Sequence, residues 1–263
     1  MNIRNDSADE PLLISETDGV IFFTLNRPKQ FNALSLAVLH ALHAALDAIA
    51  DNPDARVVVI AANGNAFCAG HDLKEMRIAN DQASVTKLFR LCSDVMLKIA
   101  KVPLPVIAEV NGMATAAGCQ LVAQCDLAVA ADHARFAVSG VNLGLFCSTP
   151  AVPLSRVISQ KRAAEMLMTG DFIDASTALD WGLINRVVPL DALRAETLKL
   201  AATLKTKPRT ALAMGKALFY RQMEMDIETA YSDATNAIAC NFMQPEAQEG
   251  VTAFLEKRKP VWE

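Results

Sequence analysis

Apolar residues in the first 200 positions follow two alternating patterns. Short runs rich in valine and isoleucine predict buried strands at residues 20–25, 56–61, 106–110 and 127–130. Apolar residues three or four apart predict helices, the first of which follows Ser35, a favourable N-terminal cap. Further helices are predicted at 84–100, 118–124, 161–168 and 176–181, the last ended by Gly182. This alternation predicts an α/β fold of stacked β-β-α units whose helices cover the sheets.

The pattern changes after Val187-Val188-Pro189, where only helical patterns follow. Helices are predicted to begin at Pro208, Asp226 and Pro245. The sequence thus predicts a core over 16–200 and a helical region over 201–263. Residues 1–15 are predicted to form a flexible tail. The uncharged stretch 136–155 is broken by glycine, polar residues and two prolines, so it predicts loop and buried strand and not a membrane span.

Two segments place small residues where a predicted strand gives way to a helix. Val110–Leu121 contains Asn111-Gly112 and a run of alanine and glycine before Gln120, and Phe67–Leu73 contains Ala69-Gly70-His71. Small side chains let a substrate carbonyl approach the main chain, and a helix N-terminus offers unpaired N–H groups. The two segments predict an oxyanion hole, in which two backbone N–H groups converge on one oxygen. The alternative is close helix–strand packing alone, which also uses Asn-Gly turns.

Five motifs in this chain resemble those of the enoyl-CoA hydratase/isomerase family, also called the crotonase superfamily, in the family's order and with similar spacing. They are Asn26–Ser35, Phe67–Met76, Pro105–Asp126, Met166–Gly170 and Glu249–Pro260. The resemblance covers nearly the whole chain. It implies a crotonase-type spiral of repeated β-β-α units with a C-terminal helical domain.

The resemblance also implies which groups carry the chemistry. The backbone N–H groups of His71 and Ala117 would hold the thioester oxygen of an acyl-CoA substrate. The family's two catalytic carboxylates fall at Gln120 and Gly140, and neither residue is acidic. Hydration of an enoyl double bond needs one group to take a proton and another to deliver one, and neither glutamine nor glycine exchanges protons near neutral pH. This departure argues against hydratase activity of the ordinary kind.

Reactions that need only enolate stabilisation depend less on the missing carboxylates. Decarboxylation of a malonyl-type thioester forms the enolate by expelling carbon dioxide, and needs no base. The Ala69–Asp72 and Val141–Gly144 segments are similar to decarboxylase members of the superfamily, but Leu145–Pro150 lacks the tyrosine that those members carry. Three hypotheses stay open: an enzyme of the lyase or isomerase class, a malonyl-type-CoA decarboxylase, and a non-catalytic acyl-CoA-binding or assembly protein.

Several polar residues near the predicted site have a functional and a structural interpretation. Asn142 is a candidate for a replacement polar contact, although such residues more often form turns. The same two interpretations apply to Ser139, Cys147, Ser148 and Thr149. The His71 ring either contacts substrate or has a structural role. Cys147 as a nucleophile would need a base, and no histidine is obviously placed to serve.

The resemblance assigns the coenzyme A contacts to two regions. One lies in the N-terminal part, with Arg27 a looser possibility, and its candidates are Lys29, Phe31, Ala33, Leu34, Ala69 and Asp72. The other is the C-terminal helix, where Phe254 and Lys257 are three residues apart and share one face, an apolar plate beside a cation. Coenzyme A is expected only as part of the substrate, with no permanently bound cofactor. The resemblance further implies a homotrimer or a dimer of trimers.

Composition fits this picture. Charged residues make up 21%, hydrophobic residues 52%, and the net charge is −4 with a pI near 5.6, so no basic surface for nucleic acid is expected. The six cysteines include no Cys-x-x-Cys pair, and His40 and His43 have no third ligand nearby, so neither a disulfide framework nor a metal site is predicted. The N-terminal residues lack the basic and apolar pattern of a secretory signal, and no membrane partner is expected. A cytoplasmic protein is predicted.

Overall fold

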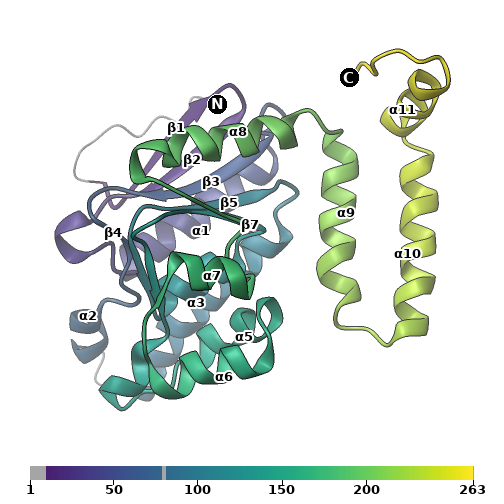
Figure 1. Ribbon diagram of the computed structural model, residues 1–263. Coiled ribbons are helices and arrows are strands. Elements are labelled where there is room, and N and C mark those ends of the chain that lie inside the picture. The colour runs from purple at the N-terminus through teal and green to yellow at the C-terminus, as the bar shows by residue number, and fades with distance from the viewer. Residues whose placement is uncertain (1–9, 79–80, 263) are drawn as a thin grey trace.

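A body of two β-sheets carries a projecting group of helices at its C-terminal end (Figure 1). The computed structural model describes residues 10–78 and 81–262. The strands are β1 (Leu12–Thr17), β2 (Val20–Leu25), β3 (Val57–Ala62), β4 (Ala66–Cys68), β5 (Val106–Val110), β6 (Met113–Thr115), β7 (Leu127–Ala131), β8 (Arg135–Ala137), β9 (Ile173–Asp174) and β10 (Arg186–Val188). The helices are α1 (Leu36–Ala50), α2 (Leu73–Ile78), α3 (Gln82–Lys101), α4 (Ala117–Gln124), α5 (Ser148–Val157), α6 (Gln160–Thr169), α7 (Ala175–Trp181), α8 (Leu193–Lys205), α9 (Arg209–Gln222), α10 (Ile227–Phe242) and α11 (Pro245–Leu255), with short 3-10 turns η1 (Pro28–Gln30), η2 (Ser139–Leu143) and η3 (Leu190–Ala192).

The larger sheet has the order β1-β2-β3-β5-β7-β10. β1 and β2 are antiparallel, and the other neighbours are parallel. Side chains of β2 alternate between two cores: Ile21 and Phe23 join the main core with α1 and α3, while Val20 and Phe22 join a second core with α8. A sheet covered on both faces explains why its strands read as continuous apolar runs.

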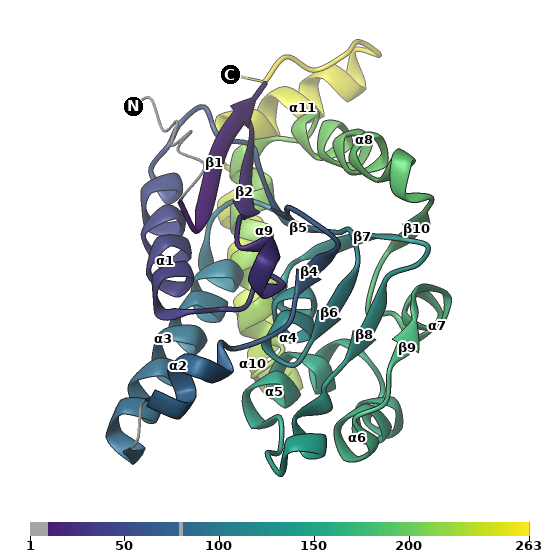
Figure 2. The same cartoon turned by 90° about the vertical axis from the view of Figure 1, so that its left-hand side faces the viewer.

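The smaller sheet has the order β4-β6-β8-β9 and lies beside the larger one (Figure 2). Each of the pairs β3–β4, β5–β6 and β7–β8 sends its first strand to the larger sheet and its second to the smaller one, and a helix or 3-10 turn follows. This arrangement confirms the predicted α/β fold of repeated β-β-α units.

Two sequence expectations for local structure are wrong. Residues 12–15, assigned to a flexible tail, belong to β1, where Leu12 pairs with Leu25 and is buried. Residues 1–9 of the expected tail lie outside the described residues. The second error concerns α5, which occupies a stretch expected to be loop and strand. Pro150 lies in its first turn, where a missing N–H costs little, and Pro153 is buried, so packing outweighs the usual penalty of a proline inside a helix.

The C-terminal helices divide into one that covers the sheet and three that leave the body. α8 runs without a break across residue 200, where the sequence places a boundary, and buries Leu193, Leu200 and Ala201 on the larger sheet. α9 contacts α3, and its Lys216 donates to the carbonyls of Ile99 (2.8 Å) and Leu104 (2.9 Å) and to Asp126 (2.6 Å). The buried ammonium group of Lys216 therefore fixes α9, and with it the projecting hairpin of α9 and α10, to the body.

Candidate active site

Three loops of the candidate site follow three neighbouring strands. β4 pairs in parallel with β6, and β6 pairs in parallel with β8, so their carboxyl ends lie at the same edge of the smaller sheet (Figure 2). The loops are residues 69–72 after β4, Ala116 before α4, and residues 138–144 after β8. Because of this topology, His71, Ala117 and Gly140, which are far apart in sequence, come from adjacent loops.

The first loop is held against the Phe31–Leu34 segment by backbone hydrogen bonds. The N–H of Ala69 donates to the Phe31 carbonyl (3.0 Å), that of Leu34 to Gly70 (2.7 Å), and that of Asp72 to Leu34 (3.3 Å). His71 lies within this ladder, yet no hydrogen bond among the described residues uses its N–H. The loop thus offers one free main-chain donor beside the candidate coenzyme segment.

The second loop makes a strained turn into α4. Ala116 adopts φ 50° and ψ −120°, a conformation that non-glycine residues rarely take, and its N–H donates to the Ala137 carbonyl (2.9 Å). Ala117 is then the first helical residue, so its N–H has no partner within the helix, and no bond of the described chain uses it. The turn is a second free donor at the positive end of a helix dipole.

Glycine brings these two loops into contact. A Cβ on Gly70 would lie 3.2 Å from the Ala117 nitrogen, and a Cβ on Gly118 would lie 2.1 Å from the Cys68 carbonyl oxygen. Gly70 also has φ +90°, where other residues are strained. Small residues are therefore required for α4 to approach the loop after β4. This contact fits close helix–strand packing, and it also fits an oxyanion hole formed by the two loops.

Gln120 is buried one turn into α4. It is 3% exposed, and its Oε1 atom has no hydrogen-bond partner among the described residues. An unpaired buried acceptor is uncommon in a folded protein. This position can offer a neutral hydrogen-bonding group to a ligand, but no proton-transfer group.

Gly140, the position to which the family resemblance assigns the second carboxylate, has no room for a side chain. A Cβ on Gly140 would lie 2.7 Å from both the Sγ of Cys147 and the carbonyl oxygen of Leu145. The N–H of Gly140 donates to that Sγ at 3.2 Å. Burial raises the pKa of the Cys147 thiol, so it stays protonated at neutral pH and does not act as a nucleophile. A thiol occupies the space that a side chain at position 140 would need.

Other polar candidates divide between the site and the surface. The hydroxyls of Thr115 and Ser139 pair at 2.9 Å and connect the second and third loops, a contact that the sequence does not reveal for Thr115. Asn142 is exposed, and its Nδ2 lies 3.5 Å from the Gly170 carbonyl, at the end of α6. Ser148 and Thr149 are in the first turn of α5. Among the described residues, Asn142 makes no hydrogen bond with His71 or Gln120.

The N-terminal coenzyme candidates form one network around the first loop. Arg27 pairs with Asp72 at 3.1 Å and donates to the Ala33 carbonyl at 3.1 Å. Leu34 is fully buried, whereas Phe31 is 59% exposed in a left-handed conformation, and Lys29 is exposed. The exposed pair is thus available to a ligand, and the buried residues hold the segment in place.

Phe254 and Lys257 belong to a different part of the molecule. α11 lies in the upper right of Figure 1, while α2, which follows the first loop, lies at the lower left. Phe254 is 83% exposed, and Lys257 follows α11 in a left-handed conformation. Within one chain, Phe254 and Lys257 therefore do not form one site with the loops that carry His71 and Ala117.

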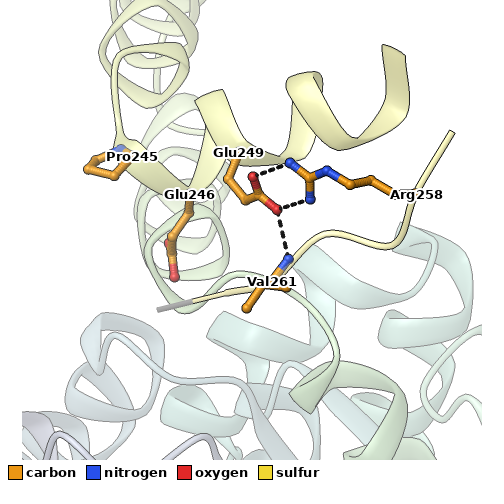
Figure 3. Close-up of a pocket in the computed structure, with 5 residues that line it drawn as sticks. All are labelled: Pro245, Glu246, Glu249, Arg258 and Val261. Atoms are coloured by element: carbon orange, nitrogen blue, oxygen red, sulfur yellow. Dashed lines mark hydrogen bonds and ion pairs between the residues drawn. The ribbon is translucent and has the colours of Figure 1, made fainter. Parts of the chain in front are cut away.

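A cavity of about 390 Å³ near these residues is distinct from the candidate active site (Figure 3). It is lined by Pro245, Glu246, Glu249, Arg258 and Val261. Arg258 donates to both carboxylate oxygens of Glu249, at 2.6 and 2.8 Å, and holds the pKa of that carboxyl at about 2. Arg258 and Glu249 therefore neutralise each other, and Glu246 accepts a hydrogen bond from the N–H of Thr210 at 3.2 Å.

Comparisons with known proteins agree with the fold. The family model for enoyl-CoA hydratase/isomerase matches residues 15–263. The chain is similar to mouse enoyl-CoA hydratase domain-containing protein 3, mitochondrial, with 47% identity over 97% of this chain and 86% of that protein. Among solved structures, it is similar to enoyl-CoA hydratase from Mycobacterium smegmatis, with 58% identity, a TM-score of 0.94, and coverage of 96% of this chain and 98% of that one. The human domain-containing protein 3 gives a TM-score of 0.93 at 47% identity, covering 96% of this chain and 100% of that one.

None of the helices found in residues 10–78 and 81–262 has the length and apolar character needed to cross a membrane. Within the same ranges, no three histidine, cysteine or acidic side chains gather in a way that would hold a metal ion.

Proposed function

Because the chain belongs to the enoyl-CoA hydratase/isomerase family, we propose that it acts on an acyl-CoA thioester and stabilises an enolate with the N–H groups of His71 and Ala117. The observation that carries this proposal is the contact between the two loops, in which Gly70 leaves 3.2 Å between its would-be Cβ and the Ala117 nitrogen. Both N–H groups are free of other partners in the described chain.

The main chain supplies the chemistry of this proposal. Negative charge that develops on the thioester oxygen would be stabilised by the two N–H groups and by the α4 dipole. Each such donor contributes about 10²–10³-fold in rate in well-studied enzymes. The site needs no side chain for this step, which is why it can persist without the two carboxylates.

The closed position at Gly140 favours decarboxylation over hydration as the specific reaction. In decarboxylation of a malonyl-type thioester, the bond between the α-carbon and the carboxylate breaks, its electrons form the enolate, and carbon dioxide leaves. The α-carbon then takes a proton from water. Hydration instead needs a proton acceptor and a donor, and a missing one costs about 10²–10⁴-fold. The same closure also favours the non-catalytic acyl-CoA-binding protein as a second candidate.

The coenzyme would lie between two copies of the chain. We place its near part at Lys29 and Phe31, on the segment that the buried Ala33 and Leu34 hold beside Ala69 and Asp72. We place its nucleotide at Phe254 and Lys257 of a neighbouring copy, in a homotrimer or dimer of trimers. Large exposed apolar residues on α10, among them Ile227 (73%), Tyr231 (68%) and Ile238 (64%), support such an assembly. Cytoplasmic location stays a prediction, and the mouse relative is named as mitochondrial.

The test is a panel of crotonyl-, malonyl- and methylmalonyl-CoA with wild type and two variants. Ala117→Pro deletes one donor at a helix position that tolerates proline, and Gly70→Ala fills the space beside that donor. Gly215→Ala is the matched control, since nothing lies within 4 Å of its added methyl group. Circular dichroism checks that each variant is folded.

The outcomes separate the hypotheses. Turnover of one substrate that falls about 10²-fold or more in both site variants, but not in Gly215→Ala, supports the enzyme. Binding without turnover in wild type, weakened in both site variants, supports the non-catalytic protein. Turnover and binding that are equal in wild type and both folded variants would refute the oxyanion site.

A further inference from the structure

The imidazole of His71 is a buried polar group without a partner. Neither Nδ1 nor Nε2 is accessible to solvent, and neither makes a hydrogen bond among the described residues. The ring packs edge-on against Phe89 of α3, with 4.9 Å between the ring centroids and 86° between their planes. The Leu34 carbonyl is near enough to raise the pKa slightly, but it does not form a hydrogen bond of normal geometry.

The ring is neutral at physiological pH. Burial lowers the pKa of His71 from 6.5 to about 4. A neutral imidazole has one N–H donor and one acceptor nitrogen, and both are unsatisfied here. Leaving such groups buried and unpaired destabilises the folded protein, so a ligand that pairs with them gains affinity that a purely apolar ligand does not.

The place of the ring relates it to the acyl group. The backbone N–H of His71 is one of the two donors of the proposed oxyanion site. The side chain therefore belongs to a residue whose main chain would bind the thioester oxygen. The other buried unpaired atom of the site, Oε1 of Gln120, comes from the helix that supplies the second donor. Both unpaired groups thus belong to the loop and the helix that meet where Gly70 approaches the Ala117 nitrogen.

We propose that the His71 imidazole is a specificity-determining residue that recognises an oxygen substituent on the acyl group, at the α- or β-carbon. This inference rests on the proposed function, because it takes the thioester to lie at the two N–H groups. A hydroxyl and a carboxylate share the required chemistry, since the oxygen of either accepts from the imidazole N–H. A hydroxyl can in addition donate to Gln120 Oε1.

The experiment compares dissociation constants of 3-hydroxybutyryl-CoA, succinyl-CoA and butyryl-CoA, by calorimetry, for wild type and His71→Phe. Phenylalanine keeps the aromatic contact with Phe89 and the backbone N–H but removes both nitrogens. We expect wild type to bind at least one oxygen-bearing ligand about 10-fold or more tightly than butyryl-CoA. In His71→Phe that preference should vanish, so that the three ligands bind with similar affinities. His133→Phe, a change at an exposed histidine, is the control.

Thermal stability separates recognition from a structural role. Because the nitrogens are unpaired, His71→Phe should melt at the same temperature as wild type or about 2–4 °C higher. A large loss of stability would show that the ring has structural partners and would overturn the inference. Equal affinity of wild type for all three ligands, or an unchanged preference in His71→Phe, would also overturn it.

Failure of the inference is distinguishable from failure of the proposed function. Gly70→Ala should weaken the binding of all three ligands if the thioester lies at the two N–H groups. If it does so while the oxygen preference is absent, the proposed site stands and the role of the imidazole is refuted. If Gly70→Ala changes nothing, the proposed site itself is refuted.

Discussion

Because neighbouring atoms fill the space beside Gly140, we predict that a side chain introduced at this position destabilises the protein. Gly140→Ala adds a methyl group 2.7 Å from both the Leu145 carbonyl oxygen and the Cys147 Sγ. Neither neighbour can move freely, because the N–H of Leu145 donates to the Gly140 carbonyl (3.0 Å) and the Gly140 N–H donates to Sγ (3.2 Å). Overpacking of this kind costs about 1–3 kcal/mol, and we expect Gly140→Ala to lose that much unfolding free energy.

A double-mutant cycle with Cys147→Ala tests the cause. Removing Sγ opens one of the two obstructions, so Gly140→Ala should cost about 0.5–1.5 kcal/mol less in the Cys147→Ala background. The Leu145 carbonyl remains, so the cost should not disappear. Urea unfolding measures all four proteins. The control is Gly215→Ala on α9, which should be neutral or stabilising by up to about 1 kcal/mol, because alanine is the better helix former.

The functional counterpart is Gly140→Glu together with Gln120→Glu. A glutamate at 140 must leave the backbone through the same Cβ, so we expect the double variant to show no gain in crotonyl-CoA hydration. A cost of Gly140→Ala below about 0.5 kcal/mol, a cost independent of Cys147, or a rise in hydration of about 10²-fold in the double variant would refute the steric reasoning.

Three further predictions concern strain, the hairpin anchor and the C-terminal ion pair. Ala116→Gly should relieve a strained φ of 50°, worth about 1–3 kcal/mol, against a loss of about 0.4–1 kcal/mol from the more flexible unfolded chain, so urea unfolding should show a net gain of about 1 kcal/mol. Lys216→Met should lower the unfolding free energy by about 3–5 kcal/mol, since it leaves Asp126 and two carbonyls without their ammonium partner. For Glu249, a folded pKa of about 2 against 4.5 unfolded means that its stabilising contribution is present above pH 4.5 and is lost as the pH falls toward 2. The difference in unfolding free energy between wild type and Arg258→Gln should therefore shrink over that range.

The sequence predicted the fold wherever an element is long and its pattern is regular. The strands around residues 57–62 and 106–110 and the helix from Leu36 to Ala50 are confirmed, because two buried faces or one apolar stripe leave a clear record. The three-residue strands β4, β6 and β8 were not predicted, since they are too short for periodicity and depend on pairing with distant strands. The error at α5 arose because buried prolines are rare inside helices.

The candidate site was predictable only in part, for a similar reason. The small residues at 69–70 and 116–118 identify the two loops, because close backbone approach restricts which side chains fit there. The lack of space beside Gly140 was not predictable from the sequence. It depends on a turn that brings the Sγ of Cys147 back to the N–H of Gly140, seven residues earlier in the chain. Whether the His71 ring has a partner also depends on the three-dimensional neighbours of its loop.

Buried polar atoms without partners among the described residues include two groups. Under α8 they are Oε2 of Glu109 and Oγ1 of Thr197, and in the candidate site they are the ring nitrogens of His71 and Oε1 of Gln120. Under α8, Glu109 pairs through one oxygen with Arg194 at 2.9 Å, and burial raises its pKa while Arg194 lowers it. Its neighbours Ala108 and Val110 face the main core, so Glu109 faces away from the oxyanion loops. The buried carboxylate is thus compensated in part, through one of its two oxygens, by the helix that covers it. In the candidate site, on the loop after β4 of the smaller sheet, the His71 ring has neither a charged partner nor a hydrogen bond among the described residues. The cost of burial is offset in part at Glu109 but not at His71, which is consistent with the proposed contact between the His71 ring and a ligand.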